Sequence, residues 1–348
     1  MAKSSRKVQI IIGACGLVLG GLLLFDIFRN TDFSRTFQII GTIGTAGIFL
    51  LFIPSIAGAL FDAFGWKHLL PESIIGRTFW RMMRVRTAAE SVVCTVPLGA
   101  VAADPLKAWL IKRHFGVSLA SGTASVALRT FLLGQSQSVI VLVVALAGFS
   151  WLTTFSYALL HNSSLSWLTV AVSAATLVIY TIVMLAASMG SLTRKLHDIL
   201  TKIPFQKIRS WFEEQEVHFH ELNTEFASFG KERTTSIWYA FGAYIALWSM
   251  EGLETYVILR LIGSPLPLTT AYALEAICSF IRSLAFFIPS GLGAQDAGYV
   301  GFLSGSGLSH PTAIAFILIK RLRQLVWIAV GFVILFAFET RPRKMLDV

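Results

Sequence analysis

A segment broken by proline and glycine constrains the fold of this chain more than any other feature. It reads Phe286-Phe-Ile-Pro-Ser-Gly-Leu-Gly-Ala-Gln-Asp-Ala-Gly-Tyr-Val300 and lies inside strongly hydrophobic sequence. Pro289 has no backbone N–H and interrupts a helix, and Gly291 and Gly293 permit positive φ angles. Such backbone is tolerated at membrane depth only where protein or water satisfies its polar groups. The segment therefore predicts a re-entrant turn that lines a cavity and bears one carboxylate, Asp296.

An earlier segment shares the spacing of this one. Pro97 precedes Asp104 by seven residues, as Pro289 precedes Asp296. A Gly-apolar-Ser turn follows in each copy, and a cation lies eleven residues after the Ser, Arg129 in the first copy and Lys320 in the second. Two broken segments in corresponding halves of a chain indicate a transporter site at the interface of internal repeats. A chance match within an apolar sequence is the alternative.

Composition places the chain among integral membrane proteins. Hydrophobic residues make up 55% of the 348 residues, charged residues make up 14%, and the mean hydropathy is +0.70. A soluble globular protein is far more polar. The net charge of +10 comes without a basic tail or an aromatic-basic module, so we expect no nucleic-acid partner. The three cysteines, Cys15, Cys94 and Cys278, are far apart in apolar segments and are interpreted as packing residues.

The hydrophobic runs predict six transmembrane helices, at 8–28, 37–61, 131–157, 167–189, 235–261 and 312–338. The basic stretch 62–90, with Trp66 and Trp80, predicts an interfacial helix, and a solvated loop is the alternative. Residues 91–103 are too few to span a bilayer and have cations on both sides, which favours a re-entrant hairpin. Residues 190–233 carry an aromatic helical face that predicts a helix on the membrane or against the bundle.

The fold class that follows is an all-α polytopic membrane protein with two re-entrant helical hairpins in an inverted repeat. It forms one integral membrane domain, residues 1–348, with approximate halves 8–189 and 235–340 joined by a cytoplasmic amphipathic segment, 190–234. With both termini inside, 21 of the 29 Lys and Arg residues are cytoplasmic and three are external. This asymmetry predicts a multi-pass inner-membrane protein whose two hairpins enter from opposite faces.

Charged residues inside the hydrophobic runs are the candidate chemistry. They can pair with one another, or some cations can attract a lipid phosphate into a cavity between the hairpins. Glu275 and Arg282 are seven residues apart on one helical face and can pair. The candidate substrate-binding residues are Pro97, Asp104, Lys107, Arg129, Glu251, Glu254, Glu275, Arg282, Pro289, Gly291, Gly293, Asp296, Lys320, Arg321 and Arg323.

Three groups of residues resemble a known family. They are Val96-Pro-Leu-Gly-Ala-Val-Ala-Ala-Asp-Pro-Leu-Lys-Ala-Trp109 with Gly116-Val-Ser118 and Arg129; Leu253-Glu-Thr-Tyr-Val-Ile-Leu-Arg-Leu-Ile-Gly263; and Ile288-Pro-Ser-Gly-Leu-Gly-Ala-Gln-Asp-Ala-Gly298 with Arg321. This pattern, spread over residues 8 to 340, resembles the flippase-like transmembrane domain of lysylphosphatidylglycerol synthases and its stand-alone relatives, including the branch associated with hopanoid biosynthesis.

The resemblance implies a lipid-handling membrane domain, and the chain departs from it at particular positions. Family members often carry Glu where this chain has Asp104 and Asp296, and Gly where it has Ser290. The shorter carboxylates keep the charge but reach less far towards a headgroup. The sequence holds no counterpart of the soluble aminoacyl-transferase domain of the full synthases, so lysine transfer to lipid is not implied.

The leading functional hypothesis is a lipid translocase that moves an amphiphile, hopanoid-type or polyprenyl-linked, between leaflets. A membrane-embedded transferase with Asp104 or Asp296 as a base on a lipid headgroup is one alternative. A non-transporting accessory subunit of a lipid-biosynthesis complex is another. No nucleophile-base, metal-ligand or phosphate-loop spacing occurs, so we expect no metal or cofactor and no catalytic site. The expected partners are the bilayer and a lipid substrate, with lipid-biosynthesis enzymes or a second copy of the chain as further partners.

Overall fold

Helices make up almost all of the structure. The computed structural model describes residues 2–29, 31–71, 79–99, 103–188 and 233–340, and within these ranges it contains no strand, which confirms the all-α prediction. In chain order the elements are α1 (Ala2–Arg29), α2 (Phe33–Gly41), α3 (Gly44–Lys67), α5 (Phe79–Thr95), α7 (Asp104–Phe115), α8 (Leu119–Ala147), α9 (Phe149–Leu160), α10 (Ser164–Ser188), α14 (Thr234–Leu261), α15 (Leu268–Leu284), the 3₁₀ turn η1 (Pro289–Gly291), α16 (Ala294–Gly305) and α17 (His310–Thr340).

Four helices in these ranges are long and apolar enough to cross a membrane. They are α3, α8, α10 over Ser164–Leu185 and α17 over His310–Phe338. The outward side chains of α10 are apolar and exposed, among them Val178, Ile179 and Ile182, as expected for a surface in contact with lipid. The chain is therefore a polytopic membrane protein, and the spans predicted over α1 and α14 remain predictions.

Two of the predicted spans are wrong in their bounds. The span 37–61 is divided between α2 and α3 at Thr42 and Ile43, where Gly44 has φ 58°. The span 131–157 is divided at Gly148 between α8 and α9, and α8 begins twelve residues earlier, at Leu119. Hydrophobicity runs across both breaks without a change, because local backbone geometry rather than polarity ends these helices.

The helix predicted for 62–90 is also wrong in its bounds. Asp62 to Lys67 continue α3, and α5 begins at Phe79 and packs against α3 and α17. Met82 and Val85 of α5 are fully buried, so one face of α5 packs in the protein interior, and its place at the membrane surface stays a prediction. The amphipathic segment predicted for 190–233 lies outside the described residues except for Arg233.

The two sequence copies have the same local structure. In each, a helix ends near the Pro, and a short helix that carries the Asp in its first turn follows, α7 in the first copy and α16 in the second. Each short helix is followed by a glycine with a left-handed backbone, Gly116 at φ 72° and Gly307 at φ 85°. A Ser and a long helix, α8 or α17, come next. This agreement supports a true repeat, and the inverted orientation in the membrane stays a prediction.

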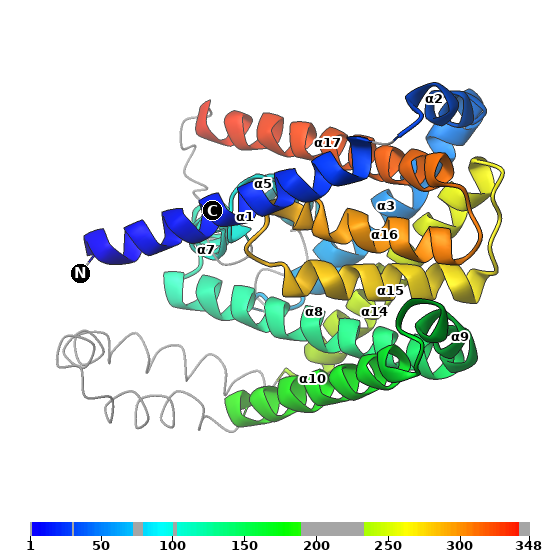
Figure 1. The fold of residues 1–348 in the computed structure, drawn as a ribbon. Helices are drawn as coiled ribbons and strands as arrows, with labels where there is room; N and C mark the ends of the chain where they lie inside the picture. Colours follow the sequence, from blue (N-terminus) through cyan, green and yellow to red (C-terminus); the bar gives the residue numbers. More distant parts are fainter. Residues whose placement is uncertain (1, 30, 72–78, 100–102, 189–232, 341–348) are drawn as a thin grey trace.

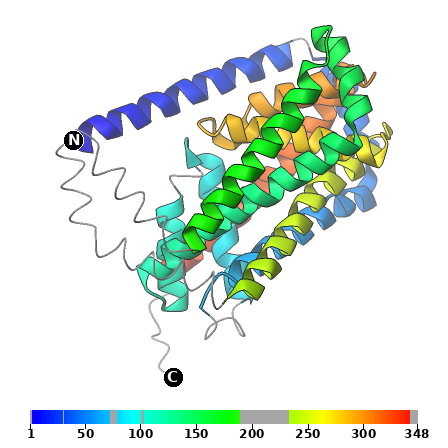
Figure 2. The same cartoon turned by 90° about the horizontal axis from the view of Figure 1, so that it is seen from below.

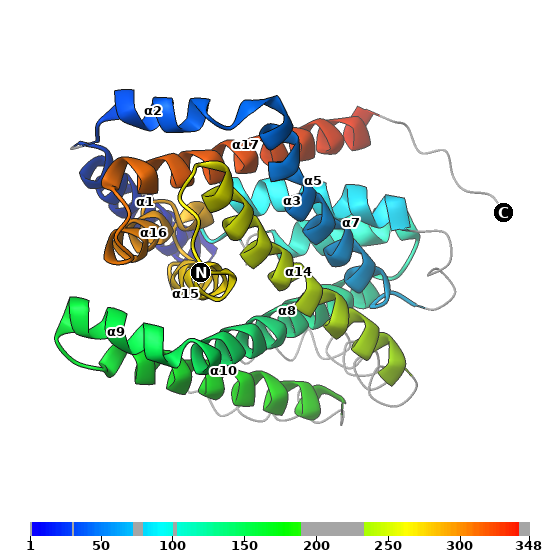
Figure 3. The ribbon, with the colours of Figure 1, turned by 90° about the vertical axis from the view of Figure 1, so that its right-hand side faces the viewer.

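The long helices form a bundle in which the second copy contacts the first on two sides. Helix α17 and η1 pack against α5, and α15 packs against α8. In Figure 1, α17, α16, α15 and α8 lie one below another and run in broadly the same direction. Helix α1 runs along the edge of this bundle and meets it at α16 and η1 (Figure 2). On the other side α14 packs along α3, as Figure 3 shows, and also contacts α15 and α8. The break after α15 is thus enclosed by α1, α5 and α16.

Candidate functional site

The break after α15 has the geometry that its proline and glycines predict. Ser290, Gly291 and Gly293 have φ angles of 51°, 61° and 80°. A Cβ atom on Gly293 would lie 2.5 Å from the carbonyl oxygen of Gly20 in α1, so no side chain fits there. The Gly293 N–H donates to Asp296 Oδ2 at 2.9 Å and caps the start of α16. The residues predicted from this segment therefore shape the break itself.

The two broken segments meet in the interior. Ser290 Oγ, in the second break, donates to the carbonyl oxygen of Cys94 near the end of α5 at 3.0 Å. Gln324 Nε2 of α17 donates to Ser290 Oγ at 2.7 Å. Pro97 follows the end of α5 in a turn where Leu98 has φ 57°. Polar contacts thus join α5, the second break and α17 at one point.

Arg321 binds Asp296 with both ends of its guanidinium group. Its Nε lies 3.0 Å from Asp296 Oδ1, and its Nη2 lies 2.8 Å and 2.9 Å from the two carboxylate oxygens. Nη1 donates to Gln324 Oε1 at 2.7 Å and to the Ser290 carbonyl at 3.4 Å. Asp296 is 1% exposed. Arg321 therefore ties α17 to the break, and a second role in lipid binding stays a prediction.

Glu275 lies at the centre of a second buried cluster. Lys320 Nζ and Thr255 Oγ1 each lie 2.5 Å from Glu275 Oε2, and the Tyr299 hydroxyl lies 3.0 Å from both carboxylate oxygens. Lys320 Nζ also donates to the Tyr299 hydroxyl at 3.2 Å. Two hydroxyl groups and one ammonium group satisfy this carboxylate, which joins α14, α15, α16 and α17. The sequence did not indicate Tyr299 or Thr255, because uncharged polar residues are common in membrane helices.

Glu254 and Arg323 form a looser pair. Arg323 Nε lies 2.8 Å from Glu254 Oε1, although the N–H does not point at the oxygen and both atoms are buried without a hydrogen bond. Glu254 is 1% exposed, so this pair joins α14 to α17 in the interior. A close pair that lacks an aligned hydrogen bond is less stabilised than the neighbouring Arg321 pair.

Arg282 is the exception among the predicted intramembrane cations. In the part of the chain that the structure describes, no carboxylate lies within 4 Å of Arg282 and its guanidinium makes no hydrogen bond. Glu251 makes the largest favourable electrostatic interaction with Arg282 and is also without an ion pair there. The guanidinium carbon lies 6.0 Å from the centre of the Trp248 ring. The predicted Glu275–Arg282 pair is therefore wrong, because Lys320 occupies the Glu275 carboxylate.

The charged residues of the first copy form separate pairs. Arg129 binds Asp62 through Nε at 3.0 Å and Nη2 at 2.7 Å, and Arg86 Nε lies 2.7 Å from the same carboxylate. Lys107 Nζ lies 2.7 Å from Asp104 Oδ1 within α7. Asp62 is 1% exposed and was missed by the sequence reasoning, which placed it at the start of an interfacial segment. The signal was present, because a carboxylate directly after an apolar run requires a partner.

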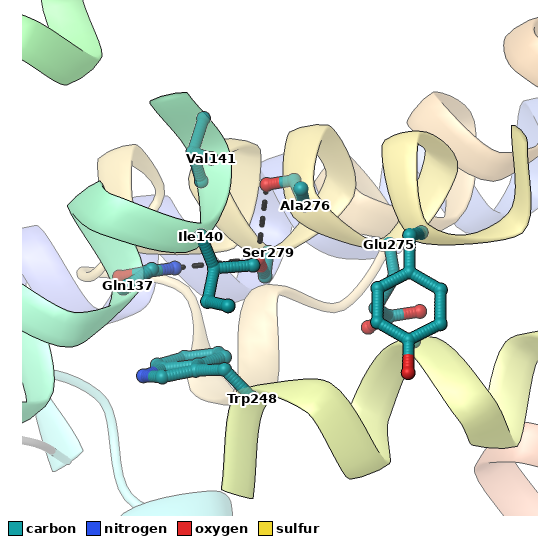
Figure 4. A pocket seen from close by; sticks show the side chains of 9 residues that line it. Gln137, Ile140, Val141, Trp248, Glu275, Ala276 and Ser279 are labelled. Carbon is teal, nitrogen blue, oxygen red and sulfur yellow. Dashed lines mark hydrogen bonds between the residues drawn. The ribbon is translucent and has the colours of Figure 1, made fainter. Parts of the chain in front are cut away.

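A narrow cavity lies among α8, α14 and α15, beside Glu275. It is lined by Gln137, Ile140, Val141, Trp248, Gly252, Tyr272, Glu275, Ala276 and Ser279, and its volume is about 10 Å³. Figure 4 shows Gln137 of α8 beside Ser279 and Ala276 of α15, with Trp248 and Glu275 nearby. Gln137 Nε2 donates to Ser279 Oγ and Ser283 Oγ, each at 3.3 Å. A space of this size holds about one water molecule, so the site is closed to a lipid headgroup in this conformation.

A known protein family matches most of this chain. The family model described as the lysylphosphatidylglycerol synthase TM region matches residues 11–331, almost the whole chain. The chain belongs to this family. Comparisons with curated proteins and with solved structures find no match. Membership supports a function related to membrane lipid, and it does not choose between translocation, headgroup transfer and an accessory role.

In this lysylphosphatidylglycerol synthase TM region, the predicted site residues divide into two groups. The second copy and α14 bring together Glu251, Glu254, Glu275, Arg282, Asp296, Lys320, Arg321 and Arg323, around the break that contains Pro289, Gly291 and Gly293. The first copy contributes the α5 end with Pro97, while Asp104 and Lys107 pair with each other on α7 and Arg129 pairs with Asp62. The candidate site is therefore centred on α14, α15 and α17.

Proposed function

We propose that this protein is a lipid translocase whose substrate headgroup carries a phosphate that Arg282 binds. The family supports a role with membrane lipid, and the observation that carries the proposal is the unpaired state of Arg282 among the described residues. An intramembrane cation is costly unless a partner satisfies it. Lys320, Arg321, Arg323 and Arg129 each have a carboxylate within ion-pair distance, whereas Arg282 has only the more distant charge of Glu251, which leaves its guanidinium N–H groups open to a ligand.

The surroundings of Arg282 fit a phosphate. Its guanidinium faces Trp248, and its side chain packs against the break, since a Cβ on Gly291 would lie 3.0 Å from Arg282 Cγ. The next residue along α15, Ser283, is exposed and forms hydrogen bonds with Gln137. Hydroxyl and amide groups therefore lie at the α8–α15 interface, one residue along α15 from Arg282. Arginine binds a phosphate with two parallel hydrogen bonds, which suits recognition of a lipid headgroup.

Translocation requires this site to open. The cavity at the α8–α15 interface, which Gln137 and Ser279 line but Arg282 does not, has a volume of about 10 Å³ and cannot hold a headgroup. We propose that α8 and α15 separate at Gln137, Ser279 and Ser283, whose hydrogen bonds of 3.3–3.4 Å are long and easily exchanged for water. The paired residues around Glu275 and Asp296 would hold α14, α16 and α17 together during this motion.

The lipid class and the orientation are part of the same proposal. Hopanoid-type and polyprenyl-linked lipids with a phosphate-bearing headgroup are the first substrates to test. The protein is placed in the inner membrane with both termini cytoplasmic, which the distribution of Lys and Arg supports. The broken segments would then enter from opposite faces and lie on either side of the substrate path.

Reconstitution in liposomes tests the role of Arg282. Arg282→Ala should slow the movement of a phosphate-bearing fluorescent lipid between leaflets by about 10- to 100-fold, because a hydrogen bond to a charged group contributes about 1.5–3 kcal/mol. Arg282→Lys should recover only part of the rate, since a lysine makes no bidentate contact. Leaflet position is read by quenching of the fluorescent lipid from outside.

The matched control is Arg260→Ala. Arg260 is an exposed arginine at the end of α14 whose guanidinium lies 5.0 Å from the Tyr256 ring centre, far from the broken segments in sequence. Its variant should transport at the wild-type rate. Thermal unfolding of every variant separates loss of binding from loss of folding. A well-folded Arg282→Ala protein that transports at the wild-type rate would show that Arg282 does not bind the headgroup.

A further inference from the structure

An apolar groove lies on the outer face of α3 and α14, away from the charged residues described above. Its volume is about 430 Å³, and it is lined by Leu60, Phe61, Phe64, Phe79, Trp238, Tyr239, Gly242, Ala243 and Ala246. Its lining includes small residues of α14 and aromatic side chains of α3, α5 and α14. Figure 3 shows α3 and α14 side by side. A hollow of this size lies within the usual range for ligand pockets.

One end of the groove carries a cation. Lys67, the last residue of α3, has its Nζ 5.0 Å from the Phe64 ring centre and 5.9 Å from the Phe79 ring centre, and both rings line the groove. No carboxylate lies within 4 Å of this ammonium among the residues that the structure describes. The neighbouring His68 ring packs on Phe64 and on Tyr239, with centres 4.4 Å and 5.5 Å apart. The groove therefore combines an apolar body with a single charged end.

This arrangement has the polarity of a membrane lipid. Trp238 and Tyr239 lie in the first two turns of α14 and are exposed, which is typical of aromatic side chains at the level of lipid headgroups. Lys67 ends the apolar α3, a place where lysine extends its ammonium to the interface. The rest of the groove then extends from the interface into the hydrocarbon. An acyl chain of a bound phospholipid would fill the apolar part, and the phosphate of that lipid would contact the Lys67 ammonium.

We propose that this groove is a binding site for an anionic phospholipid, with an acyl chain between α3 and α14 and the phosphate on Lys67. The site does not include Arg282 or any residue of the proposed transport path, so it would hold a resident lipid that stabilises the α3–α14 contact. The leaflet is the one predicted as cytoplasmic from the distribution of Lys and Arg.

A substitution that fills the groove gives the direct test. Gly242 lines the groove and a Cβ on it meets no atom within 4 Å, so Gly242→Leu adds an isobutyl group to the groove with no clash at its Cβ. Gly301→Leu is the matched control, because Gly301 is a helical glycine of α16 that also has open space around its Cβ. The detergent-purified proteins are titrated with phosphatidylglycerol or phosphatidylcholine, and bound lipid is counted by native mass spectrometry.

We expect the wild type and Gly301→Leu to bind one phosphatidylglycerol in preference to phosphatidylcholine, and Gly242→Leu to lose this binding by at least about 10-fold. Lys67→Gln should keep lipid binding but lose the preference for the anionic headgroup. Equal phosphatidylglycerol binding by Gly242→Leu and wild type would overturn the proposal. The proposal would also be overturned if the wild type bound no lipid and a Gly242→Cys variant cross-linked to residues 189–232, since the chain itself would then fill the groove. Arg282→Ala should leave this binding unchanged whether or not the protein translocates lipid.

Discussion

Replacement of Arg321 should affect stability and transport differently according to its role, which is either to pair with Asp296 or to bind a lipid headgroup. Asp296 is 1% exposed and receives its cationic hydrogen bonds from Arg321. Removing one partner of a buried ion pair costs about 3–5 kcal/mol, because the other charge is left uncompensated. We therefore expect Arg321→Ala to lower the free energy of unfolding by about 3–5 kcal/mol.

A second substitution separates the stranded charge from the helix cap. In the Arg321→Ala background, Asp296→Asn removes the charge but keeps an oxygen that accepts the Gly293 N–H. Asp296→Ala removes both, and the loss of such a cap costs about 0.5–2 kcal/mol. The Asn double variant should therefore recover most of the lost stability, and the Ala double variant should recover about 0.5–2 kcal/mol less.

Denaturant titration in mixed micelles, followed by tryptophan fluorescence, gives the unfolding free energies. The control is again Arg260→Ala, which removes an exposed arginine and should change stability little. If the losses of unfolding free energy in the Arg321→Ala and Asp296→Asn single variants sum to the loss in the double variant within about 0.5 kcal/mol, the two residues do not form a stabilising pair. An Arg321→Ala protein with wild-type stability but without transport would instead assign Arg321 to headgroup binding.

Two further predictions concern the first copy. Asp62→Asn leaves both Arg86 and Arg129 without their carboxylate, whereas Arg86→Met keeps the Asp62–Arg129 pair. Asp62→Asn should therefore lower the midpoint of thermal unfolding more than Arg86→Met does. Equal midpoints for the two variants would contradict this. His114 lies on α7 outside the predicted spans, and burial together with nearby arginines lowers its pKa below the ordinary 6.5. As the pH falls, the His114 imidazole is therefore protonated in the unfolded chain before it is protonated in the folded protein. The free energy of unfolding should decrease as the pH drops below about 6.5, and His114→Phe should make this decrease smaller. An unchanged slope would show that His114 is not responsible.

Proline and glycine allowed the broken segments to be predicted from the sequence. Pro289 and Gly293 act through local backbone geometry, which does not depend on the rest of the fold. The shared spacing from Pro to Asp predicted that the two segments are related, and in both a short helix carries the Asp in its first turn. Apolar composition was enough to identify a polytopic α-helical membrane protein, because only helices and closed barrels satisfy backbone groups in lipid.

Pairing of the charges could not be predicted in the same way. Helical spacing brought Glu275 and Arg282 to one face of α15, but the packing of α17 places Lys320 on Glu275. Arg129 was expected to find a carboxylate from the broken segments or from α14 or α15, and it binds Asp62 of α3 instead. These contacts depend on how helices distant in sequence pack together. Periodicity within one helix contains no information about that packing.

Transport by the purified wild-type protein tests the central claim most directly. The protein is reconstituted in liposomes that contain a phosphate-bearing polyprenyl or hopanoid lipid, and both the leaflet distribution and the mass of that lipid are measured over time against protein-free liposomes. We predict that the lipid redistributes between leaflets with its mass unchanged. A lipid of altered mass would identify a transferase, and a lipid that neither moves nor changes would contradict translocation.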